Sequence, residues 1–527
     1  MIGGMSTPHV VAIDLGTSGP KVVVVTPDGH AVGTALARVD PIRLPDGGIE
    51  QDPEQVWRAV IDATTRALAA AEIAPDHVVA VICTGQYSSI VPVDRDGRPT
   101  ANMILWQDHR GSPRRLRDLP GVPKMIDSPV KLAKWLRVHG LPPVADGLSL
   151  NHMRFLRYGR PDVYERTAHL LEPVDFLTMR LTGRATANQA TAFMSLMVDN
   201  RTLDARDYSA ELVAMSRIDH RKLPELVPMD AVVGTLLPAV AAELGLLPAT
   251  KVLTGLNDTQ AGGIGCGAFT GDHAGLSLGS TGVMITHVDR KHTDARHAIL
   301  SMPSPVPDTY FVMAENGMAG ATLDWLLANV VYPDDPFHDV IVDHDERFRR
   351  LEAAAAGSPP GSHRLLFLPW IGGAMAPSAS GAMRGGFLNI TPTTTRSDMA
   401  RAVLEGVALN LRWLRDPVQR FAGRTFDHYR LYGGGARSAL WCQIMADVMG
   451  RPVHQLHDSA HTVGVGAALL AFERLGMIGF DDIATAVRTR RVFEPDPSTA
   501  DTYDLLAEQL VKAFGRTRPI FRALDRR

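Results

Sequence analysis

The chain contains few cysteines, little net charge and no long apolar run. Its three cysteines, Cys83, Cys266 and Cys442, are far apart and odd in number, so we expect no disulfide framework and a reducing compartment. A formal net charge of −3 gives no reason to expect a nucleic acid partner. No apolar run approaches the ~20 residues that a membrane-spanning helix needs, and residues 1–8 lack the charged and apolar regions of a secretory signal. We therefore expect a cytoplasmic protein without a membrane partner.

Two common catalytic patterns are absent as well. The sequence has no Gly-x-x-x-x-Gly-Lys-Ser/Thr loop and no His-Glu-x-x-His, and its 19 histidines show no ligand spacing. These absences exclude a Walker-type nucleotide site and a zinc protease site. With 527 residues, of which 45% are hydrophobic, the chain can fill two cores of about 250 residues each. We place the domains at residues 8–262 and 263–527.

The N-terminal segment predicts a hairpin with a phosphate-binding turn. Two β-branched runs, residues 10–13 and 22–25, enclose the segment Asp14-Leu15-Gly16-Thr17-Ser18-Gly19. β-Branched residues favour strands, and glycines at both ends of a short loop favour a tight turn. Backbone N–H groups and hydroxyls in the turn suit a phosphate, and Asp14 suits a Mg²⁺ held directly or through water. For this motif alone, a purely structural role of Asp14 and Thr17 is an equal alternative.

A second copy of this design strengthens the functional interpretation. Leu278-Gly279-Ser280-Thr281-Gly282 follows one apolar run and precedes another, as Leu15 to Gly19 do. Two such hairpins, one early in each half, predict a duplicated fold with two phosphate loops that face each other across a cleft. Ser277 and Leu278 precede Gly279, so only the first half supplies an acid on the metal side.

The predicted strand at residues 78–83 ends in polar side chains. Gln86, Tyr87 and Ser88 follow it. Ligands collect at the carboxyl ends of strands in open α/β sheets, so these residues are candidates for binding a polyhydroxylated ligand. A polar turn between strands is the alternative.

Trp106, Asp108 and Arg110 form a second candidate group for binding a sugar. The apolar face of a sugar stacks on an indole ring, and its hydroxyls take polar contacts from a carboxylate and a guanidinium. The alternative is a surface ion pair between Asp108 and Arg110 beside a core tryptophan.

Asp258 is the candidate general base. It follows a strand at residues 251–255 and precedes a segment containing Gly262, Gly263 and Gly265, which permits close packing or hinge motion. A carboxylate within reach of a substrate hydroxyl can accept its proton during phosphoryl transfer. The alternative is that Asn257 and Asp258 cap a helix of small residues.

Gly433, Gly434 and Gly435 connect a strand at residues 429–432 to a further helix. Residues without side chains before a helix allow a nucleobase and ribose to lie against the backbone. A tight strand-to-helix connection is the alternative, although it needs fewer glycines.

Taken together, these motifs resemble the FGGY carbohydrate kinases, and within them the xylulokinases. The resemblance extends over about residues 10–480. The matching segments are Ile13 to Gly19, Glu50 to Gln55, Trp106-x-Asp108-x-Arg110, Leu278 to Gly282, Leu404 to Val407 and Gly433 to Ser438.

The resemblance implies an α/β fold of two ribonuclease-H-like domains, of the actin and sugar-kinase superfamily, flanking a cleft. It implies ATP-dependent phosphorylation of a terminal hydroxyl of a sugar or polyol, most simply a ketopentose such as xylulose, with Mg²⁺ at Asp14 and Asp258 as proton acceptor. The candidate nucleotide contacts are Asp14, Gly16, Thr17, Ser18, Lys21, Gly279, Ser280, Thr281, Gly434, Gly435 and Ser438. The candidate sugar contacts are Gln86, Tyr87, Ser88, Trp106, Asp108 and Asn257.

Two departures from the family pattern bear on the substrate. Xylulokinases commonly read Gly-Gln-Met-His-Gly where this chain has Gly85-Gln86-Tyr87-Ser88-Ser89, which changes the shape and donors of the pocket. Many members carry Ser-Gly-Glu-Arg-Thr-Pro where residues 372–377 here lack the charged pair. Ribulose, glycerol or another polyol are alternative substrates, and a non-catalytic nucleotide and sugar sensor is an alternative function. The oligomeric state is open, with a homodimer as one option.

Overall fold

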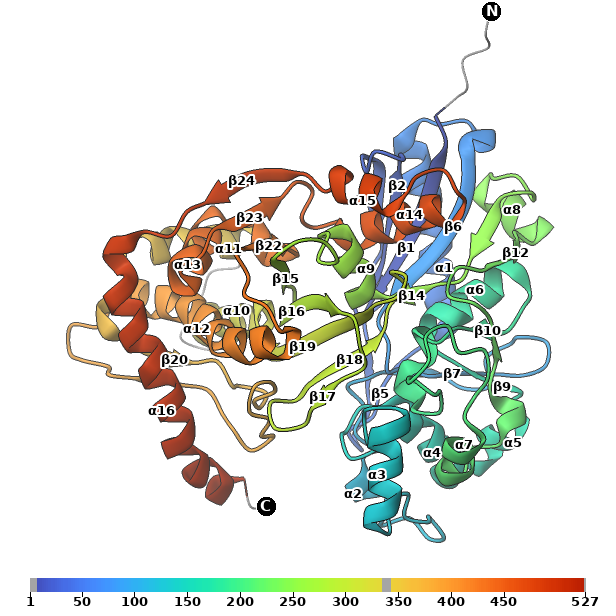
Figure 1. The fold of residues 1–527 in the computed structure, drawn as a ribbon, viewed down its shortest axis with the longest axis horizontal. Helices are drawn as coiled ribbons and strands as arrows, with labels where there is room; N and C mark the ends of the chain where they lie inside the picture. The colour runs from blue at the N-terminus through green and yellow to red at the C-terminus, as the bar shows by residue number, and fades with distance from the viewer. Residues whose placement is uncertain (1–6, 334–342, 526–527) are drawn as a thin grey trace, which may run out of the picture.

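Two mixed sheets organise the computed structural model of the chain (Figure 1). The structure describes residues 7–333 and 343–525, so most of the N-terminal segment at residues 1–8 lies outside the described residues. The described part of the chain contains no helix that is both long and apolar enough to cross a membrane. Within these residues the three cysteines are buried and form no disulfide.

The first sheet has the strand order β12-β13-β6-β1-β2-β3. β1 pairs antiparallel with β2 and parallel with β6, and a short strand, β14, pairs with the end of β6. The strands are β1 (His9–Gly16), β2 (Gly19–Val25), β3 (Ala31–Leu36), β6 (Val78–Gly85), β12 (Val232–Thr235), β13 (Lys251–Leu253) and β14 (Leu256–Asn257).

The second sheet repeats this topology, in the order β17-β18-β19-β16-β15-β22-β23-β24. β15 pairs antiparallel with β16 and parallel with β22, as β1 pairs with β2 and β6. The strands are β15 (His273–Leu278), β16 (Thr281–Val288), β17 (Thr293–Asp294), β18 (Ile299–Pro303), β19 (Tyr310–Met318), β22 (His428–Tyr432), β23 (Val453–Leu456) and β24 (Thr489–Phe493). The duplicated α/β fold predicted from the two hairpins is confirmed.

A long amphipathic helix covers one face of each sheet. Asp52 caps α1 (Pro53–Ala71) by accepting a hydrogen bond from the Glu54 N–H at 2.9 Å, and Pro53 occupies the first helical position, where its missing N–H costs nothing. α1 packs on β2 and β3. On the second sheet α12 (Arg396–Ala422) packs on β16 and β19 and is buried along most of its length.

The remaining elements surround these two cores. The first half adds β4 (Ile42–Arg43), β5 (Ile49–Gln51), β7 (Val91–Val93), β8 (Met103–Ile104), β9 (His169–Leu171), β10 (Thr186–Ala187), β11 (Glu225–Leu226), α2 (Pro113–Leu116), α3 (Pro129–Val138), α4 (Ser149–Gly159), α5 (Pro161–Arg166), α6 (Pro173–Thr182), α7 (Ala210–Ser216) and α8 (Pro238–Leu244). The second half adds α10 (Gly320–Leu326), α11 (His344–Ala356), β20 (Leu366–Leu368), β21 (Gly386–Leu388), α13 (Ala439–Met449), α15 (Phe480–Ala486) and α16 (Ala500–Leu524).

Two crossed helices join the halves of the chain. α9 (Asp258–Gly265) follows the first sheet, and α14 (Thr462–Arg474) returns from the second half to pack on β1, β2 and β6. Glycines permit the crossing: a Cβ on Gly466 would lie 2.0 Å from the Ala261 carbonyl oxygen, and one on Gly265 would lie 2.1 Å from that of Thr462. The glycines of α9 therefore serve close packing, and their predicted hinge role stays a prediction.

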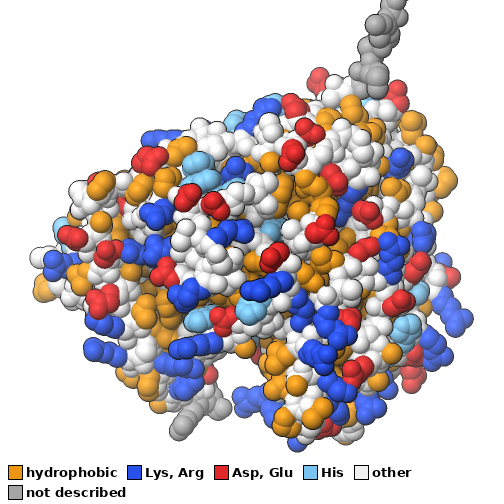
Figure 2. All heavy atoms as spheres, in the orientation of Figure 1, with side chains coloured by type: hydrophobic (Ala, Val, Ile, Leu, Met, Phe, Trp, Pro, Cys, Tyr) orange, Lys and Arg blue, Asp and Glu red, His pale blue; other side chains and the backbone are white. Residues whose placement is uncertain are grey.

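Polar contacts also join the halves away from this crossing. The Lys291 ammonium group donates to the carbonyl oxygens of Leu136 and Arg137, at 3.1 and 3.0 Å, at the end of α3. The Thr293 hydroxyl donates to the Gly140 carbonyl oxygen at 3.0 Å. Figure 2 shows the molecule hollowed along its lower edge, between the part that carries α3 and the part that carries α16.

Candidate active site

The first predicted phosphate-binding turn has two residues between its strands, and neighbouring groups hold it in place. Gly16 pairs with Gly19, which leaves Thr17 and Ser18 at the turn. Gly19 has a φ of +122°, and a Cβ there would lie 2.2 Å from the Ala37 carbonyl oxygen, so glycine is required. The Gln51 side chain donates to the carbonyl oxygens of Thr17 and Val39 at 2.8 and 2.7 Å. The turn is therefore fixed in place by the segment before α1.

The second turn connects β15 to β16. The Gly279 N–H donates to the Thr281 carbonyl oxygen at 3.1 Å, and the Gly279 carbonyl accepts from the Gly320 N–H at 2.9 Å, where α10 begins. Ser280 lies at the tip of the turn and is exposed. The two hairpins have the same place in their sheets, as the sequence predicts, and their contact with phosphate stays a prediction.

The triple glycine packs on the second hairpin. Gly433 has a φ of +96°, and a Cβ there would lie 2.7 Å from the Leu278 carbonyl oxygen. A Cβ on Gly435 would lie 2.6 Å from the Trp441 ring, whereas at Gly434 it would meet no atom of the described residues within 4 Å. Open space at Gly434 beside the hairpin suits the predicted adenosine contact.

Ser438, a further candidate nucleotide contact, has partners within the protein. Its hydroxyl caps α13 by accepting from the Trp441 N–H at 3.0 Å and donates to Glu352 at 2.8 Å. The structure gives Ser438 a capping role, and its contact with a nucleotide stays a prediction.

The sequence left two roles open for Asn257 and Asp258, capping a helix or contacting a ligand. In the structure the two residues differ. Asn257 is 1% exposed and caps α9: its side-chain oxygen accepts from the Gln260 N–H at 2.9 Å and from the Thr259 hydroxyl at 2.8 Å. Asp258 is the first residue of α9 and is partly exposed. Its Oδ1 is buried and has no hydrogen-bond partner among the described residues. Asp258 is thus free to bind a ligand, while the amide oxygen of Asn257 is occupied by the helix.

The electrostatic surroundings make Asp258 a suitable base. Its pKa is raised to about 7, mainly by burial and then by the Asp14 and Glu315 carboxylates, against the opposing effects of the Thr259 N–H and Lys21. Burial also raises the pKa of Asp14. A carboxylate whose pKa lies near neutral pH is a stronger proton acceptor than an ordinary one, and such shifts are typical of functional sites.

Asp258 interacts electrostatically with groups near both hairpins. Asp14, from the end of β1, raises its pKa, and Asp258 in turn raises the pKa of Tyr432, after burial and Cys266. Tyr432 pairs with Ser277, near the end of β15, just before the second turn. The carboxylate is therefore not separated from the phosphate turns, which the kinase interpretation requires.

Three of the predicted ligand contacts meet at the first turn. The Thr17 hydroxyl donates to the Gln86 side-chain oxygen at 3.3 Å and accepts from the Trp106 indole N–H at 3.2 Å. The Gln86 side-chain nitrogen is buried and finds no acceptor in the described part of the chain. The three residues follow the ends of β1, β6 and β8. The sequence prediction assigned Thr17 to the nucleotide and Gln86 and Trp106 to the sugar, and the structure brings the three side chains together.

Tyr87 and Ser88 lie beside them. The Tyr87 hydroxyl donates to the Met313 Sδ of β19 at 2.9 Å. Burial, then the Asp258 and Glu315 carboxylates, raises the pKa of Tyr87 well above its usual value. Ser88 is buried and has a φ of +59°, so its backbone takes a left-handed conformation. Tyr87 therefore joins the first sheet to the second next to Asp258.

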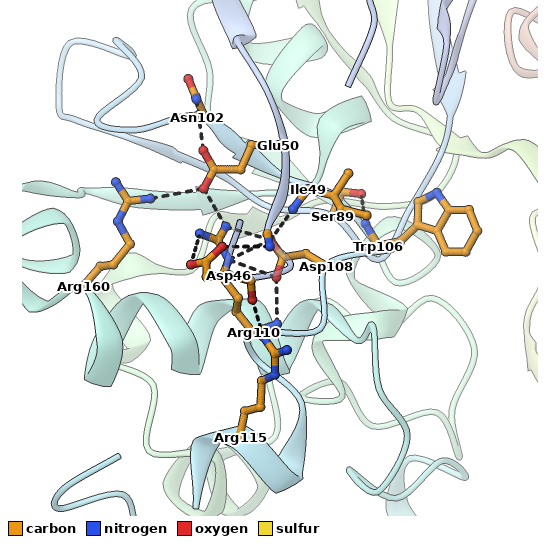
Figure 3. Close-up of polar contacts among 11 residues, drawn as sticks. Asp46, Ile49, Glu50, Ser89, Asn102, Trp106, Asp108, Arg110, Arg115 and Arg160 are labelled. Atoms are coloured by element: carbon orange, nitrogen blue, oxygen red, sulfur yellow. Dashed lines mark hydrogen bonds and ion pairs between the residues drawn. The ribbon is translucent and has the colours of Figure 1, made fainter. Parts of the chain in front are cut away.

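The Asp108–Arg110 pair is buried, which corrects the alternative of a surface pair beside a core tryptophan (Figure 3). Asp108 is 0% exposed and accepts from the Ile49 N–H at 2.9 Å and from the Arg110 guanidinium at 2.7 Å. Arg110 also donates to Glu50 at 2.6 Å. Trp106 is partly exposed and held by the Ser89 hydroxyl at 3.0 Å. The cluster anchors the loop that presents Trp106, and a direct contact of Asp108 with sugar stays a prediction.

Comparison with known proteins identifies this arrangement. The family model of the FGGY carbohydrate kinases, N-terminal domain, matches residues 9–265, and that of the C-terminal domain matches residues 274–473. The chain belongs to the FGGY family of carbohydrate kinases. It is therefore a phosphotransferase with an alcohol group as acceptor, and the family uses ATP as the phosphoryl donor.

Relatives of this carbohydrate kinase differ in substrate. The chain is 26% identical over 522 residues to the xylulose kinase of Bacillus subtilis (strain 168), covering 98% of both chains. The crystal structure of gluconate kinase from Lactobacillus acidophilus has a TM-score of 0.84 at 21% identity, over 99% of this chain and 100% of that one. Xylulose kinase from Rhodospirillum rubrum has a TM-score of 0.80 at 26% identity, over 98% and 100%. The fold is thus shared, and the sugar is not decided by similarity.

The donor groups of this carbohydrate kinase fit Mg²⁺. In phosphoryl-transfer sites Mg²⁺ keeps several waters and takes one or two carboxylates plus the substrate phosphates. Asp14 offers one buried carboxylate beside the first turn. The described residues contain no group of three or more His, Cys, Asp or Glu side chains that would hold a metal alone. A site at Asp14 completed by phosphates and water fits both observations.

Sequence reasoning missed Glu315 of β19. Its side chain is partly buried, and burial raises its pKa to about 7. The signal was present, because Glu315 directly follows an apolar run, Tyr310-Phe311-Val312-Met313-Ala314. A charged residue at such a position is rarely buried without a reason.

Proposed function

We propose that this carbohydrate kinase transfers the γ-phosphoryl group of ATP to a terminal hydroxyl of a neutral sugar or polyol, with a ketopentose such as xylulose as the first candidate. The observation that carries the proposal is Asp258, a partly exposed carboxylate with a pKa near 7 that interacts electrostatically with groups near both hairpins. The xylulose kinases among its relatives support the choice of sugar. A cytoplasmic location is part of the proposal and rests on the sequence.

Different residues of the site have different roles in the phosphoryl transfer. Asp258 accepts the proton of the attacking hydroxyl, so that positive charge does not build up on the oxygen as it bonds to phosphorus. Backbone N–H groups of the two turns, with the Thr17, Ser280 and Thr281 side chains and Lys21, hold the phosphates. Mg²⁺, when bound at Asp14, neutralises charge on the transferred group.

Charge at the site supports a neutral substrate over an aldonate such as gluconate. Asp14 and Glu315 raise the pKa of Asp258, and Lys21 is the cation that opposes them. Two like unit charges about 6 Å apart repel by roughly 3 kcal/mol at an effective dielectric constant of ~20. The carboxylate of an aldonate therefore meets a cost that a ketose or polyol does not.

The test of the base is Asp258→Asn. We expect kcat to fall by about 10²–10⁴-fold, because Asn cannot accept the proton, while the affinity for ATP stays nearly unchanged. In the wild-type enzyme kcat/KM is expected to rise as pH passes through about 7, because the raised pKa of Asp258 means that the carboxylate is ionised only above it. In the Asp258→Asn variant, kcat/KM should not rise with pH in this range.

Asp96→Asn provides the control, since Asp96 forms an exposed pair with Arg98. An Asp258→Asn enzyme that keeps its kcat would refute the assignment of the base.

The test of the substrate is ADP release across D-xylulose, D-ribulose, glycerol and D-gluconate. Turnover of a neutral sugar with little turnover of gluconate is expected. Preference for gluconate would contradict the charge argument. Binding of ATP and sugar without turnover of any of the four would favour the alternative of a non-catalytic sensor.

A further inference from the structure

Alternate residues of β19 face the junction of the two sheets. Side chains two apart in a strand point to the same side, so Phe311, Met313 and Glu315 form one row. A Cβ on Gly263 of α9 would lie 2.7 Å from the Phe311 ring, and Met313 accepts the hydrogen bond of Tyr87. The other two members of this row thus contact α9, the helix that Asp258 begins, and Tyr87.

The row leads toward the first residue of α9. Phe311 lies against Gly263, five residues after Asp258, and Met313 lies against Tyr87, whose pKa Asp258 raises. Glu315 is the next member, and its carboxylate raises the pKa of both Asp258 and Tyr87. Geometry and electrostatics therefore agree that Glu315 faces Asp258 from the second sheet.

The backbone around Glu315 is held firmly. Its carbonyl oxygen accepts from the Ala376 N–H at 2.9 Å. Asn316, which points to the opposite side of the strand, donates to the carbonyl oxygens of Ala376 and Asn410 at 2.9 and 3.1 Å. The direction of the Glu315 side chain is thus set by the strand and not by a partner of its own.

The Glu315 carboxylate has no hydrogen bond or ion pair with any described residue. Within the same described set, Oδ1 of Asp258 and the side-chain nitrogen of Gln86 also have no partner. Oδ1 of Asp258 and the side-chain nitrogen of Gln86 are buried, and buried polar groups in native proteins are nearly always paired. Together with the partly exposed Glu315 carboxylate, these unpaired groups indicate a polar ligand. Two of the three are acceptors, and the ligand must bring hydrogen-bond donors.

A sugar hydroxyl meets this requirement better than a metal ion or an anion. The carboxylates do not converge closely enough, among the described residues, to hold a metal by themselves, and they repel an anion. A hydroxyl donates to a carboxylate without adding charge.

We propose that Glu315 is a substrate-binding residue, contributed by the second sheet, whose carboxylate accepts a hydrogen bond from a sugar hydroxyl other than the one that is phosphorylated. This inference rests on the proposed function. It makes the sugar site bipartite: Gln86, Trp106 and Asp258 come from the first half of the chain, and Glu315 from the second. Sugar then binds tightly only when the two sheets are in the arrangement seen here.

The experiment compares Glu315→Gln and Glu315→Ala with the wild type, using D-xylulose, D-ribulose and glycerol. We expect KM for the sugar, and its Kd by calorimetry without ATP, to rise roughly 10-fold to 100-fold, as loss of a hydrogen bond to a charged group predicts. KM for ATP should change less than about twofold. The alanine variant should be at least as impaired as the glutamine variant, because Gln keeps an acceptor oxygen.

Glu225→Gln is the matched control, since Glu225 is exposed and paired with Arg184. Unfolding temperatures of all variants verify that they are folded. An unchanged sugar Kd in a folded Glu315→Gln protein would overturn the proposal. A raised Mg²⁺ requirement with an unchanged sugar KM would overturn it too, in favour of a metal ligand.

Failure of the proposed function can be told apart from failure of this inference. A wild-type protein that binds D-xylulose but does not phosphorylate it contradicts the proposed function, and the calorimetric comparison still decides the role of Glu315. A wild-type protein that binds none of the three polyols overturns both.

Discussion

At the residue scale, adjacent polar side chains have different roles that depend on their partners. Asn257 and Asp258 both follow a strand and precede a helix, and either could cap it. The structure assigns the cap to Asn257 and leaves Asp258 without a partner for its buried Oδ1 among the described residues. Asp108 shows the reverse, since its oxygens accept from Ile49 and Arg110. Partners determine whether a carboxylate is available for chemistry.

Arg110→Met tests the buried ion cluster. The substitution leaves Asp108 and Glu50 without their shared partner, and breaking a buried pair costs about 3–5 kcal/mol. We expect the free energy of unfolding to fall by this amount in urea titrations. KM for the sugar should rise as well, because the cluster anchors the loop that carries Trp106.

Arg98→Met is the control for this prediction, because Arg98 and Asp96 form an exposed pair that contributes little. A loss below about 1 kcal/mol for Arg110→Met would contradict the structural role of the cluster.

At the element scale, the crossing of α9 and α14 depends on glycine. The backbones of the two helices approach so closely that Cβ atoms at Gly265 and Gly466 would overlap carbonyl oxygens of the opposite helix. Small residues allow helices to approach closely, and here the approach places Asp258, the first residue of α9, over the end of β6. The crossing thus connects packing with the position of the base.

Gly466→Ala tests this crossing. In an open helix Gly→Ala stabilises by roughly 0.5–1 kcal/mol, but at Gly466 the added Cβ would lie 2.0 Å from the Ala261 carbonyl oxygen. We expect a net loss of about 1–3 kcal/mol, as overpacking generally produces, together with a lower kcat because α9 shifts.

Gly515→Ala is the matched change, since a Cβ at Gly515 in α16 meets no described atom within 4 Å. It should be neutral or stabilising in thermal unfolding. Equal effects of the two substitutions would refute the packing argument.

At the scale of the whole molecule, the two halves contact each other at several places. Two of them are the crossing of α9 with α14 and the contact of Lys291 and Thr293 with the end of α3. A cation at the carboxyl end of a helix satisfies free carbonyl groups and complements the helix dipole. These contacts favour the arrangement in which Glu315 and Asp258 face each other.

Lys291→Met tests the second contact. Methionine keeps much of the aliphatic stem and removes the ammonium group, so the arrangement with the sheets together becomes less populated. The apparent affinity for sugar falls in proportion to that population, and we expect KM for the sugar to rise about 3-fold to 10-fold with a smaller change in kcat. Steady-state kinetics and small-angle scattering with and without sugar measure the two effects.

Lys512→Met, in an exposed pair with Glu508 on α16, should change neither quantity. If Lys291→Met behaves in the same way, this contact does not contribute to closure.

The sequence by itself determined the local elements and their repetition. β-Branched runs around glycine-flanked turns encode both hairpins, Asp52 and Pro53 encode the start of α1, and apolar spacing encodes α12, because each of these signals acts within a few residues. The repeat of the hairpin was sufficient to predict two similar sheets. The same local patterns indicated Asp14, Gln86, Trp106 and Asp258 as separate candidates, and the resemblance to the FGGY carbohydrate kinases joined them in one site.

Only the tertiary structure decided which side chains lack partners and which elements pack together. The return of α14 to the first sheet, the burial of Asp108 and the approach of Glu315 to Asp258 join residues that are far apart in the chain. Such contacts depend on how the sheets and helices are arranged, and no short sequence pattern records that arrangement. The proposed base, Asp258, could therefore be placed from the sequence, whereas its electrostatic surroundings could not.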